Sequence, residues 1–229
     1  MTRALGTVLV TGGASGLGDA VVRAVAEAGG HPLVLDVRAP AVAVAHERVD
    51  LADGRAAEAA VHRAVERAGG LDAVVTAAGI DACGPLDGVA PEAWERVVRV
   101  NLLGTAAVVR AALPHLERSG GRVVTVTSTL GLRALPHATA YCASKFGVVG
   151  FTRALAAETA GRVGVTLLVP GGMATAFFDD RDPRYRPGPD ARLNPPEHVA
   201  AAVLFALRQP HGCEVREIVI APSTETSWP

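Results

Sequence analysis

Short apolar runs rich in β-branched residues alternate with longer stretches of helical periodicity along almost the whole chain. Continuous apolar runs are typical of strands buried on both faces of a parallel sheet, and an apolar residue every three to four positions is typical of a helix packed on one side. The pattern predicts strands over residues 7–10, 32–36, 47–50, 71–76, 122–127, 163–169 and 215–220. It predicts helices over residues 19–28, 55–67, 91–117, 139–160 and 196–208.

This alternation predicts an α/β fold in which helices connect parallel strands by right-handed crossovers. We expect a single-domain Rossmann-like doubly wound parallel sheet of about seven strands flanked by helices. No linker or repeat divides the chain, so residues 1–229 are assigned to one domain. Residues 173–194 are rich in Pro, Arg and Asp, interrupt the alternation, and are long enough to form a lid over a substrate.

The composition is that of a folded globular chain. Of 229 residues, 49% are hydrophobic and 20% are charged, which excludes an intrinsically disordered chain. The net charge of −1 gives no reason to expect a nucleic-acid partner. We expect no membrane partner, because no apolar run approaches the roughly 20 residues that span a bilayer. We expect a cytoplasmic location, because the N-terminus lacks the features of a signal peptide.

The counts of two residue types bear on chemistry. The cysteines Cys83, Cys142 and Cys213 are far apart in the sequence, so we expect reduced thiols and no metal site. Lys145 is the only lysine, although the chain has 22 lysines and arginines in total. A lysine can lose its proton and act as a compact point charge, and an arginine cannot. Lys145 is therefore a candidate functional residue.

The turn after the first predicted strand is rich in glycine, since residues 11–18 read Thr-Gly-Gly-Ala-Ser-Gly-Leu-Gly. Glycines between a strand and a helix let the backbone approach a pyrophosphate, and the helix N-terminus offers N–H groups and a positive dipole end. The strand–turn–helix context favours a dinucleotide site over a turn that merely requires glycine. The cofactor-binding candidates in this turn are Gly12, Ser15, Gly16, Leu17 and Gly18.

Asp36 ends the second predicted strand. An acidic residue at this place in a dinucleotide fold hydrogen-bonds the hydroxyls of the adenosine ribose. Its carboxylate also repels a 2′-phosphate at short range. The next residue, Val37, is not basic, so we predict NAD rather than NADP as the cofactor. Arg38 leaves contact with a phosphate, and hence NADP, open as an alternative.

Four residues are candidates for catalysis. Tyr141 and Lys145 are four positions apart and share one face of a predicted helix. The ammonium and the positive charge of an oxidised nicotinamide are expected to lower the pKa of the phenol from about 10, so that Tyr141 exchanges a proton near neutral pH. Ser128 follows a strand at the carboxyl edge of the sheet and can donate to a substrate oxygen. Asn101 lies inside a predicted helix, where asparagine is unfavourable, which suggests a functional role.

Together these residues resemble the short-chain dehydrogenase/reductase family. The glycine turn, Asn101, Ser128, Tyr141-x-x-x-Lys145 and Pro170-Gly171 follow the order and spacing of that family along nearly the whole chain. The resemblance implies that Lys145 also holds the nicotinamide ribose and that Asn101 serves a water-mediated proton relay through the lysine. The further cofactor contacts that it implies are Asp50, Leu51, Ala78, Gly79, Tyr141, Lys145, Pro170, Gly171, Met173 and Thr175.

The resemblance also assigns finer roles and exposes one departure. It implies that the Asp50 carboxylate accepts from the adenine amino group, and that Thr175 helps to fix the nicotinamide ring. After the fourth strand the family usually has Asn-Asn-Ala-Gly, whereas residues 76–79 of this chain read Thr-Ala-Ala-Gly. The missing asparagine removes a hydrogen bond that braces the central sheet, so reduced local rigidity is expected there.

The residues expected around the substrate are mostly apolar, namely Ile80, Leu130, Leu132, His137, Met173, Phe177 and Phe178. They favour a lipophilic or mixed carbonyl or alcohol substrate. The arginines of the predicted lid, Arg181, Arg184 and Arg186, are interpreted as a solvated face, with contact to an anionic substrate as the alternative. Small and apolar residues along predicted helices 91–117 and 139–160, which family members usually pair between subunits, favour a homo-oligomer, either a dimer or a homotetramer.

The sequence therefore predicts an NAD(H)-dependent oxidoreductase, a short-chain alcohol dehydrogenase or carbonyl reductase with Tyr141 as general acid/base. It would interconvert a secondary alcohol and a ketone or aldehyde by hydride transfer. One alternative is an NADPH-dependent 3-oxoacyl-thioester reductase, which Asp36 disfavours. Another is a non-catalytic dinucleotide-sensing module, which the intact set of Ser128, Tyr141 and Lys145 disfavours. Epimerase or dehydratase chemistry on a related fold normally needs a longer chain than 229 residues.

Overall fold

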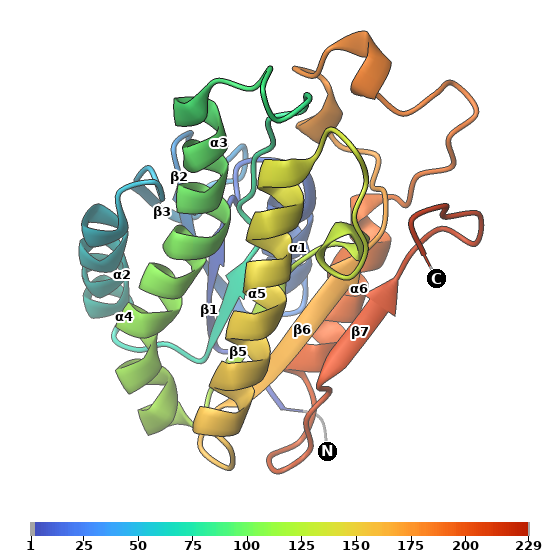
Figure 1. The fold of residues 1–229 in the computed structure, drawn as a ribbon. Coiled ribbons are helices and arrows are strands. Elements are labelled where there is room, and N and C mark those ends of the chain that lie inside the picture. The colour runs from blue at the N-terminus through green and yellow to red at the C-terminus, as the bar shows by residue number, and fades with distance from the viewer. Residues whose placement is uncertain (1–2, 229) are drawn as a thin grey trace.

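The computed structural model describes residues 3–228; residues 1, 2 and 229 of the predicted domain lie outside that range. The described residues form a seven-stranded sheet in the order β3-β2-β1-β4-β5-β6-β7, with helices on both faces (Figure 1). The strands are β1 Thr7–Thr11, β2 His31–Asp36, β3 Ala45–Arg48, β4 Ala73–Thr76, β5 Arg122–Val126, β6 Gly164–Pro170 and β7 Glu217–Ile220. The helices are α1 Gly16–Glu27, α2 Gly54–Ala68, α3 Pro91–Val98, α4 Thr105–Ser119, α5 Thr139–Glu158 and α6 Pro196–Leu207.

All neighbouring strands pair in parallel, which confirms the predicted doubly wound sheet. The chain runs outward from β1 through β2 to β3 and then returns to β4 on the other side of β1. The strand order therefore reverses between β1 and β4. At such a point the loops leave the carboxyl ends of the strands in opposite directions and open a crevice between them.

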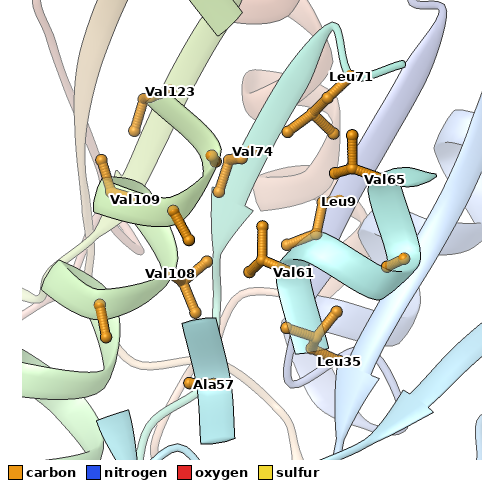
Figure 2. Close-up of a cluster of buried hydrophobic side chains, with 14 of the residues drawn as sticks. Leu9, Leu35, Ala57, Val61, Val65, Leu71, Val74, Val108, Val109 and Val123 are labelled. Atoms are coloured by element: carbon orange, nitrogen blue, oxygen red, sulfur yellow. The ribbon is translucent and has the colours of Figure 1, made fainter. Parts of the chain in front are cut away.

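Two large apolar cores, one on each face of the sheet, hold the layers together, with a third, smaller cluster of Val149, Leu167 and Val169. Residues of α2 and α4, such as Val61 and Val108, pack with Leu9 and Val74 of the sheet (Figure 2). On the opposite face α1 and α6 pack together over Val8 and the neighbouring strands. Because both faces are covered, the strands read as continuous apolar runs in the sequence.

The long predicted helix 91–117 is one helical run of three parts. A π-helical segment, Arg99–Gly104, separates α3 from α4. Gly104 lets this run approach the loop after β3, because an added Cβ would lie 2.7 Å from the carbonyl oxygen of Leu51. By length and composition alone the run Pro91–Ser119 could cross a membrane, contrary to the expectation that no such segment exists, and 56% of its most apolar window is buried inside the fold. Burial of this kind is typical of a core helix.

Residues 173–194 form an excursion beyond β6 that is closed at its base. Ala174 N donates to the carbonyl oxygen of Asn194, and Asn194 N donates to that of Gly172, both at 2.9 Å. The excursion contains the short 3-10 helices Ala176–Phe178 and Pro183–Tyr185. It is thus a loop whose two ends are hydrogen-bonded to each other and that stands beside the carboxyl edge of the sheet (Figure 1).

Candidate active site

A cavity of about 1200 Å³ opens at the carboxyl edge of the sheet. Pockets for drug-sized molecules enclose roughly 300–1,000 Å³, so this one has room for a dinucleotide and a small substrate. Two predicted site residues, Gly18 and Asn101, do not line the cavity. Each contacts a residue that does, because Gly18 packs against Gly12 and Asn101 bonds to Ile80. The predicted site residues in the cavity wall are Gly12, Ser15, Gly16, Leu17, Asp36, Asp50, Leu51, Ala78, Gly79, Ser128, Tyr141, Lys145, Pro170, Gly171, Met173 and Thr175.

The glycine turn between β1 and α1 is shaped by close backbone contacts. Gly16 has a φ of +54°, a conformation that favours glycine. A Cβ at Gly18 would overlap the carbonyl oxygen of Gly12. In the described chain the side chain of Ser15, which precedes α1, makes no capping bond to the helix. The start of α1 therefore meets the cavity with its N–H groups and positive dipole end, a cradle that suits a pyrophosphate.

Asp36 joins the end of β2 to the glycine turn. Its Oδ2 accepts from Ala14 N at 3.0 Å and its Oδ1 accepts from Arg38 N at 2.9 Å. The residue is only 8% exposed, yet it forms part of the cavity wall. The guanidinium of Arg38 reaches across the turn, where Nη2 donates to Ser15 Oγ at 2.9 Å. A carboxylate and a guanidinium thus flank the same end of the cavity.

Asp50 is held by a partner that the sequence analysis did not consider. Arg96 of α3 donates from Nη2 to Asp50 Oδ2 at 2.8 Å, and Ala52 N donates to Oδ1 at 2.9 Å. Burial by itself raises the pKa of the Asp50 carboxyl, but these two donors together hold it below its usual value. Arg96 lines the cavity as well. Sequence spacing could not identify it, because α3 meets the loop after β3 only in the folded chain.

The end of β5 and one face of α5 bring three candidate catalytic groups to the cavity. Ser128 precedes a short 3-10 helix, and its Oγ accepts from Leu130 N at 3.1 Å. Lys145 Nζ donates to the carbonyl oxygen of Val126 at 3.0 Å and lies 5.6 Å from the centroid of the Tyr141 ring. The phenol and the ammonium therefore share a helix face, as their spacing predicts.

Burial governs the proton affinity of both groups. It raises the pKa of Tyr141 to about 12, although the Ser128 hydroxyl, as a donor to the phenolic oxygen, lowers it. Burial also lowers the pKa of Lys145 to about 8, against the charge of Asp81, which raises it. The sequence predicted a lowered pKa for Tyr141. For the effect of the protein's own groups this prediction is wrong, because the loss of solvation raises the pKa by more than the neighbouring donors and charges lower it.

Asn101 acts as a brace in this structure. It lies in the π-helical segment and is 1% exposed. Its Oδ1 accepts from Ile80 N, and its Nδ2 donates to the carbonyl oxygen of Ile80, both at 2.9 Å. Nδ2 also donates to Ser144 Oγ at 3.0 Å. The side chain thus ties the loop after β4 to α5, and a role in a proton relay stays a prediction.

A buried hydroxyl lies at the end of β4, where the chain departs from the family pattern. The hydroxyl of Thr76 is buried and has no hydrogen-bond partner among residues 3–228. The rest of the loop is well held, because Ala78 N donates to Thr11 Oγ1 at 3.2 Å and Asn101 secures Ile80. The loss of rigidity expected from the missing asparagine stays a prediction.

A buried ion pair at the cavity was missed by the sequence analysis. Arg181 Nη2 lies 2.8 Å from Asp81 Oδ2, and the two side chains are 18% and 6% exposed. The guanidinium also stacks on the rings of Phe177 and Phe178. The interpretation of the lid arginines as a solvated face is wrong for Arg181, because the carboxylate that pairs with it lies 100 residues earlier in the chain.

Burial and Asp81 also raise the pKa of the Cys83 thiol to about 11. A thiol with so high a pKa is a poor nucleophile.

The C-terminal segment also reaches the cavity, again without a signal in the sequence. Glu225 Oε2 accepts from Gly172 N at 2.7 Å, and Oε1 accepts from Ser227 Oγ at 2.7 Å. The Ser227 hydroxyl lies 2.7 Å from that of Thr129, next to Ser128. This chain of bonds links the loop after β6 to the end of β5 across the mouth of the cavity.

Comparison with known proteins places the chain among dehydrogenases. Residues 6–186 match the short chain dehydrogenase family. D-threitol dehydrogenase of Mycolicibacterium smegmatis is 33% identical, with 86% of this chain and 84% of that protein covered. Cis-4-hydroxycyclohexanecarboxylate dehydrogenase of Sinomonas cyclohexanicum is 34% identical, with 86% and 87% covered. Glycine betaine reductase ATRR of Emericella nidulans is 33% identical over 95% of this chain, which spans only 19% of that protein.

A solved structure with a nucleotide bound is also similar. The alcohol dehydrogenase of the archaeon Thermococcus sibiricus, complexed with 5-hydroxy-NADP, has a TM-score of 0.81 and 25% identity, with 93% of this chain and 94% of that chain covered. The family match spans the glycine turn, Tyr141 and Lys145. The chain therefore belongs to the short-chain dehydrogenase family and is an oxidoreductase of alcohol and carbonyl substrates.

Proposed function

We propose that this chain is an NAD(H)-dependent enzyme that interconverts a secondary alcohol and a ketone or aldehyde, with Tyr141 as general acid/base. The observation that carries the proposal is the convergence of Tyr141, Ser128 and Lys145 on the same cavity as the glycine turn. A bound nicotinamide supplies the hydride acceptor or donor. The cradle at the start of α1 fits its pyrophosphate, because close backbone contacts there leave no room for side chains.

The protonated phenol suits the reductive direction. With a pKa of about 12, Tyr141 carries its proton at neutral pH and can donate it to a carbonyl oxygen. The Ser128 hydroxyl donates to the same oxygen as negative charge develops on it. In the oxidative direction the phenolate is required, and the positive charge of Lys145, together with that of an oxidised cofactor, favours it.

Asp36 supports NAD as the cofactor, because its buried carboxylate would repel a 2′-phosphate. Arg38 is the observation that favours NADP as a second candidate, since its guanidinium lies at the same end of the cavity. The Thermococcus sibiricus relative was solved with an NADP derivative. An NADPH-dependent 3-oxoacyl-thioester reductase is therefore kept as the alternative activity, and a cofactor sensor as the non-catalytic one.

We further propose that residues 173–194 act as the substrate lid and that the chain forms a homo-oligomer. The lid is supported by its position in the cavity wall through Phe177 and Arg181. Oligomer formation is supported by exposed Leu103 and Phe146 on the helical run and on α5, at 55% and 45% exposure, because apolar side chains on neighbouring helices suit a contact between subunits. The homotetramer and the cytoplasmic location stay predictions.

The test measures absorbance of the reduced nicotinamide with a panel of secondary alcohols and ketones. We expect kcat/KM with NAD to exceed that with NADP by about tenfold or more. Asp36→Asn should raise the relative use of NADP, and Arg38→Gln should lower it. A higher kcat/KM with NADP than with NAD for the unaltered protein would refute the cofactor assignment.

Replacement of the catalytic tyrosine tests the chemistry itself. Tyr141→Phe should lower kcat by about a hundredfold to ten-thousandfold, the usual contribution of general acid–base catalysis. Tyr185→Phe is the comparison variant, because it also removes one phenolic oxygen from the cavity wall, but from the lid, where it bonds to His137 Nδ1 at 2.8 Å; it should lower kcat far less than Tyr141→Phe. Equal turnover by Tyr141→Phe and the unaltered protein would exclude the assigned role. Binding of NAD without turnover of any substrate would instead favour the sensor.

A further inference from the structure

The buried ion pair Asp81–Arg181 lies on the substrate side of the cavity, between the loop after β4 and the segment 173–194. Both residues line the cavity. A second ion pair in the same segment, Arg184 with Asp182, is 70% and 45% exposed. The Asp81–Arg181 pair, at 18% and 6% exposure of arginine and aspartate, is therefore set apart by its burial.

The pair lies one aromatic ring away from the catalytic phenol. The ring of Phe177 is 5.7 Å from the ring of Tyr141, centroid to centroid, and Arg181 Cζ is 4.8 Å from the Phe177 centroid. The two charges act on the phenol in opposite directions, since Asp81 raises the pKa of Tyr141 and Arg181 lowers it. A substrate whose reacting oxygen meets Tyr141 thus has its far end within reach of the pair.

The pair keeps unused hydrogen-bonding capacity. A guanidinium has five N–H donors, and the structure pairs one of those of Arg181 with Asp81 and another, at 3.5 Å, with the Tyr185 carbonyl oxygen. Nε is buried and has no acceptor in the described part of the chain. Asp81 accepts from Ala82 N at 2.7 Å and from Cys83 Sγ at 3.2 Å, while an ionised carboxylate offers about four acceptor sites.

Charge balance decides which substrate group suits this pair. A carboxylate on the substrate would bring a second negative charge beside Asp81 in a poorly solvated site, where like charges repel strongly. Transfer of Arg181 to that carboxylate would leave Asp81 buried without a partner, which is strongly unfavourable. A hydroxyl requires neither change, because it can donate to Asp81 and accept from Arg181 at the same time.

We propose that Asp81 and Arg181 form a specificity site for a remote hydroxyl group of a neutral polyhydroxylated substrate, a polyol or a sugar, whose reacting carbon lies at Tyr141. The inference rests on the proposed oxidoreductase function and names its substrate class. It narrows the lipophilic or mixed substrate expected from the sequence to a mixed one. The apolar wall around Phe177 holds the carbon skeleton, and the ion pair recognises its hydroxyl.

Three probes that differ at one ring position test the proposal: cyclohexanol, a cyclohexanediol and a hydroxycyclohexanecarboxylate. Each is offered with NAD and with NADP, and kcat/KM is measured for alcohol oxidation. The diol should exceed cyclohexanol by about tenfold to a hundredfold, the contribution of a hydrogen bond to a charged group. The carboxylate should be no better than cyclohexanol, because its charge adds to that of Asp81.

Variants test whether the preference for the diol over cyclohexanol depends on the ion pair. Asp81→Asn, Arg181→Gln and the double variant should remove most of the diol advantage, measured in each variant as the ratio of kcat/KM for the diol to kcat/KM for cyclohexanol. The pH profile of kcat should move in opposite directions in the two single variants, because the two charges have opposite effects on Tyr141. Arg184→Gln is the matched control, since it removes an arginine of the same segment from a solvated pair, and it should change neither the preference nor the profile.

Two results would overturn the inference: the carboxylate as the best probe, or an equal loss on all three probes in the variants, as a collapsed loop would cause. Turnover of none of the probes, and of no alcohol or ketone in the wider panel, would refute the proposed function and not the binding site. Calorimetric titration of the diol into the protein then tests whether the diol binds at the ion pair. Binding that is lost in Arg181→Gln and kept in Arg184→Gln supports it, and no binding to the unaltered protein refutes it.

Discussion

Replacement of Lys145 by methionine should stabilise the fold while abolishing activity. The ammonium is buried, at 4% exposure, and burial lowers its pKa from 10.5 to about 8. Each pKa unit corresponds to about 1.4 kcal/mol, so the charged lysine costs roughly 3 kcal/mol at pH 7 relative to an unperturbed one. The lost bond from the ammonium to the Val126 carbonyl oxygen offsets about 2 kcal/mol of the gain, because hydrogen bonds to charged groups are worth more than neutral ones. The net gain is therefore about 1 kcal/mol.

The gain should depend on pH in a direction that the pKa shift sets. Between pH 8 and 10.5 the folded protein has released the Lys145 proton and the unfolded chain has not. The unfolded state then binds more protons, so the stability of the unaltered protein rises with pH in this window. Below pH 8 both states hold the proton and this group adds no slope. The advantage of Lys145→Met should therefore shrink between pH 8 and pH 10.

Urea unfolding at pH 7, 8, 9 and 10 measures this directly, and thermal unfolding provides a check. At pH 7 the melting temperature should rise by about 2–4 °C, given about 2–4 °C per kcal/mol for a chain of this size. Arg184→Gln serves as the control, because it removes a solvated charge and should not change how the free energy of unfolding depends on pH. A variant that is less stable at pH 7, or an advantage that stays constant to pH 10, would refute the burial cost assigned to Lys145.

Two further predictions concern the braces around the site. Thr76→Val should stabilise the fold by about 1 kcal/mol or more, because it replaces a buried unpaired hydroxyl with a methyl group of similar shape; a loss of stability in urea unfolding would show that this hydroxyl has a partner. Glu225→Gln should lower kcat and expose the C-terminal segment to protease, because the carboxylate bonds to Gly172 N and Ser227 Oγ are weakened. Glu217→Gln, which removes an acid from a solvated pair on β7, should do neither.

The layer architecture could be predicted because it depends on local periodicity. Buried strands such as β1 and β5 show only apolar and threonine side chains apart from Arg122, and the glycine turn marks the entry to α1. The π-helical segment Arg99–Gly104 could not be predicted, because the sequence around Asn101 has the same apolar period as an ordinary helix. It forms where Asn101 bonds to Ile80 and Ser144, contacts that exist only in the folded chain.

The site divides along the same line. Tyr141 and Lys145 could be identified because their spacing on one helix already places them on a common face. The ion pair of Asp81 with Arg181 could not be identified, because the two residues are distant in sequence. The sequence also does not distinguish an arginine at the surface from a buried one. For the protein's own groups the direction of the Tyr141 pKa shift was wrong for a related reason, since it depends on how deeply the fold buries the phenol.

The sequence by itself determined the strand–helix order, the glycine turn and the four-residue spacing of tyrosine and lysine, because these depend on neighbours along the chain. Only the tertiary structure decided which groups share the cavity across long separations. Parallel strands deliver their carboxyl ends, and the loops that follow, to one edge of the sheet. There Asp36 meets Ala14, Asp81 meets Arg181, and Glu225 meets Gly172. Burial, and with it the proton affinity of Tyr141, is a property of that assembly and of no segment alone.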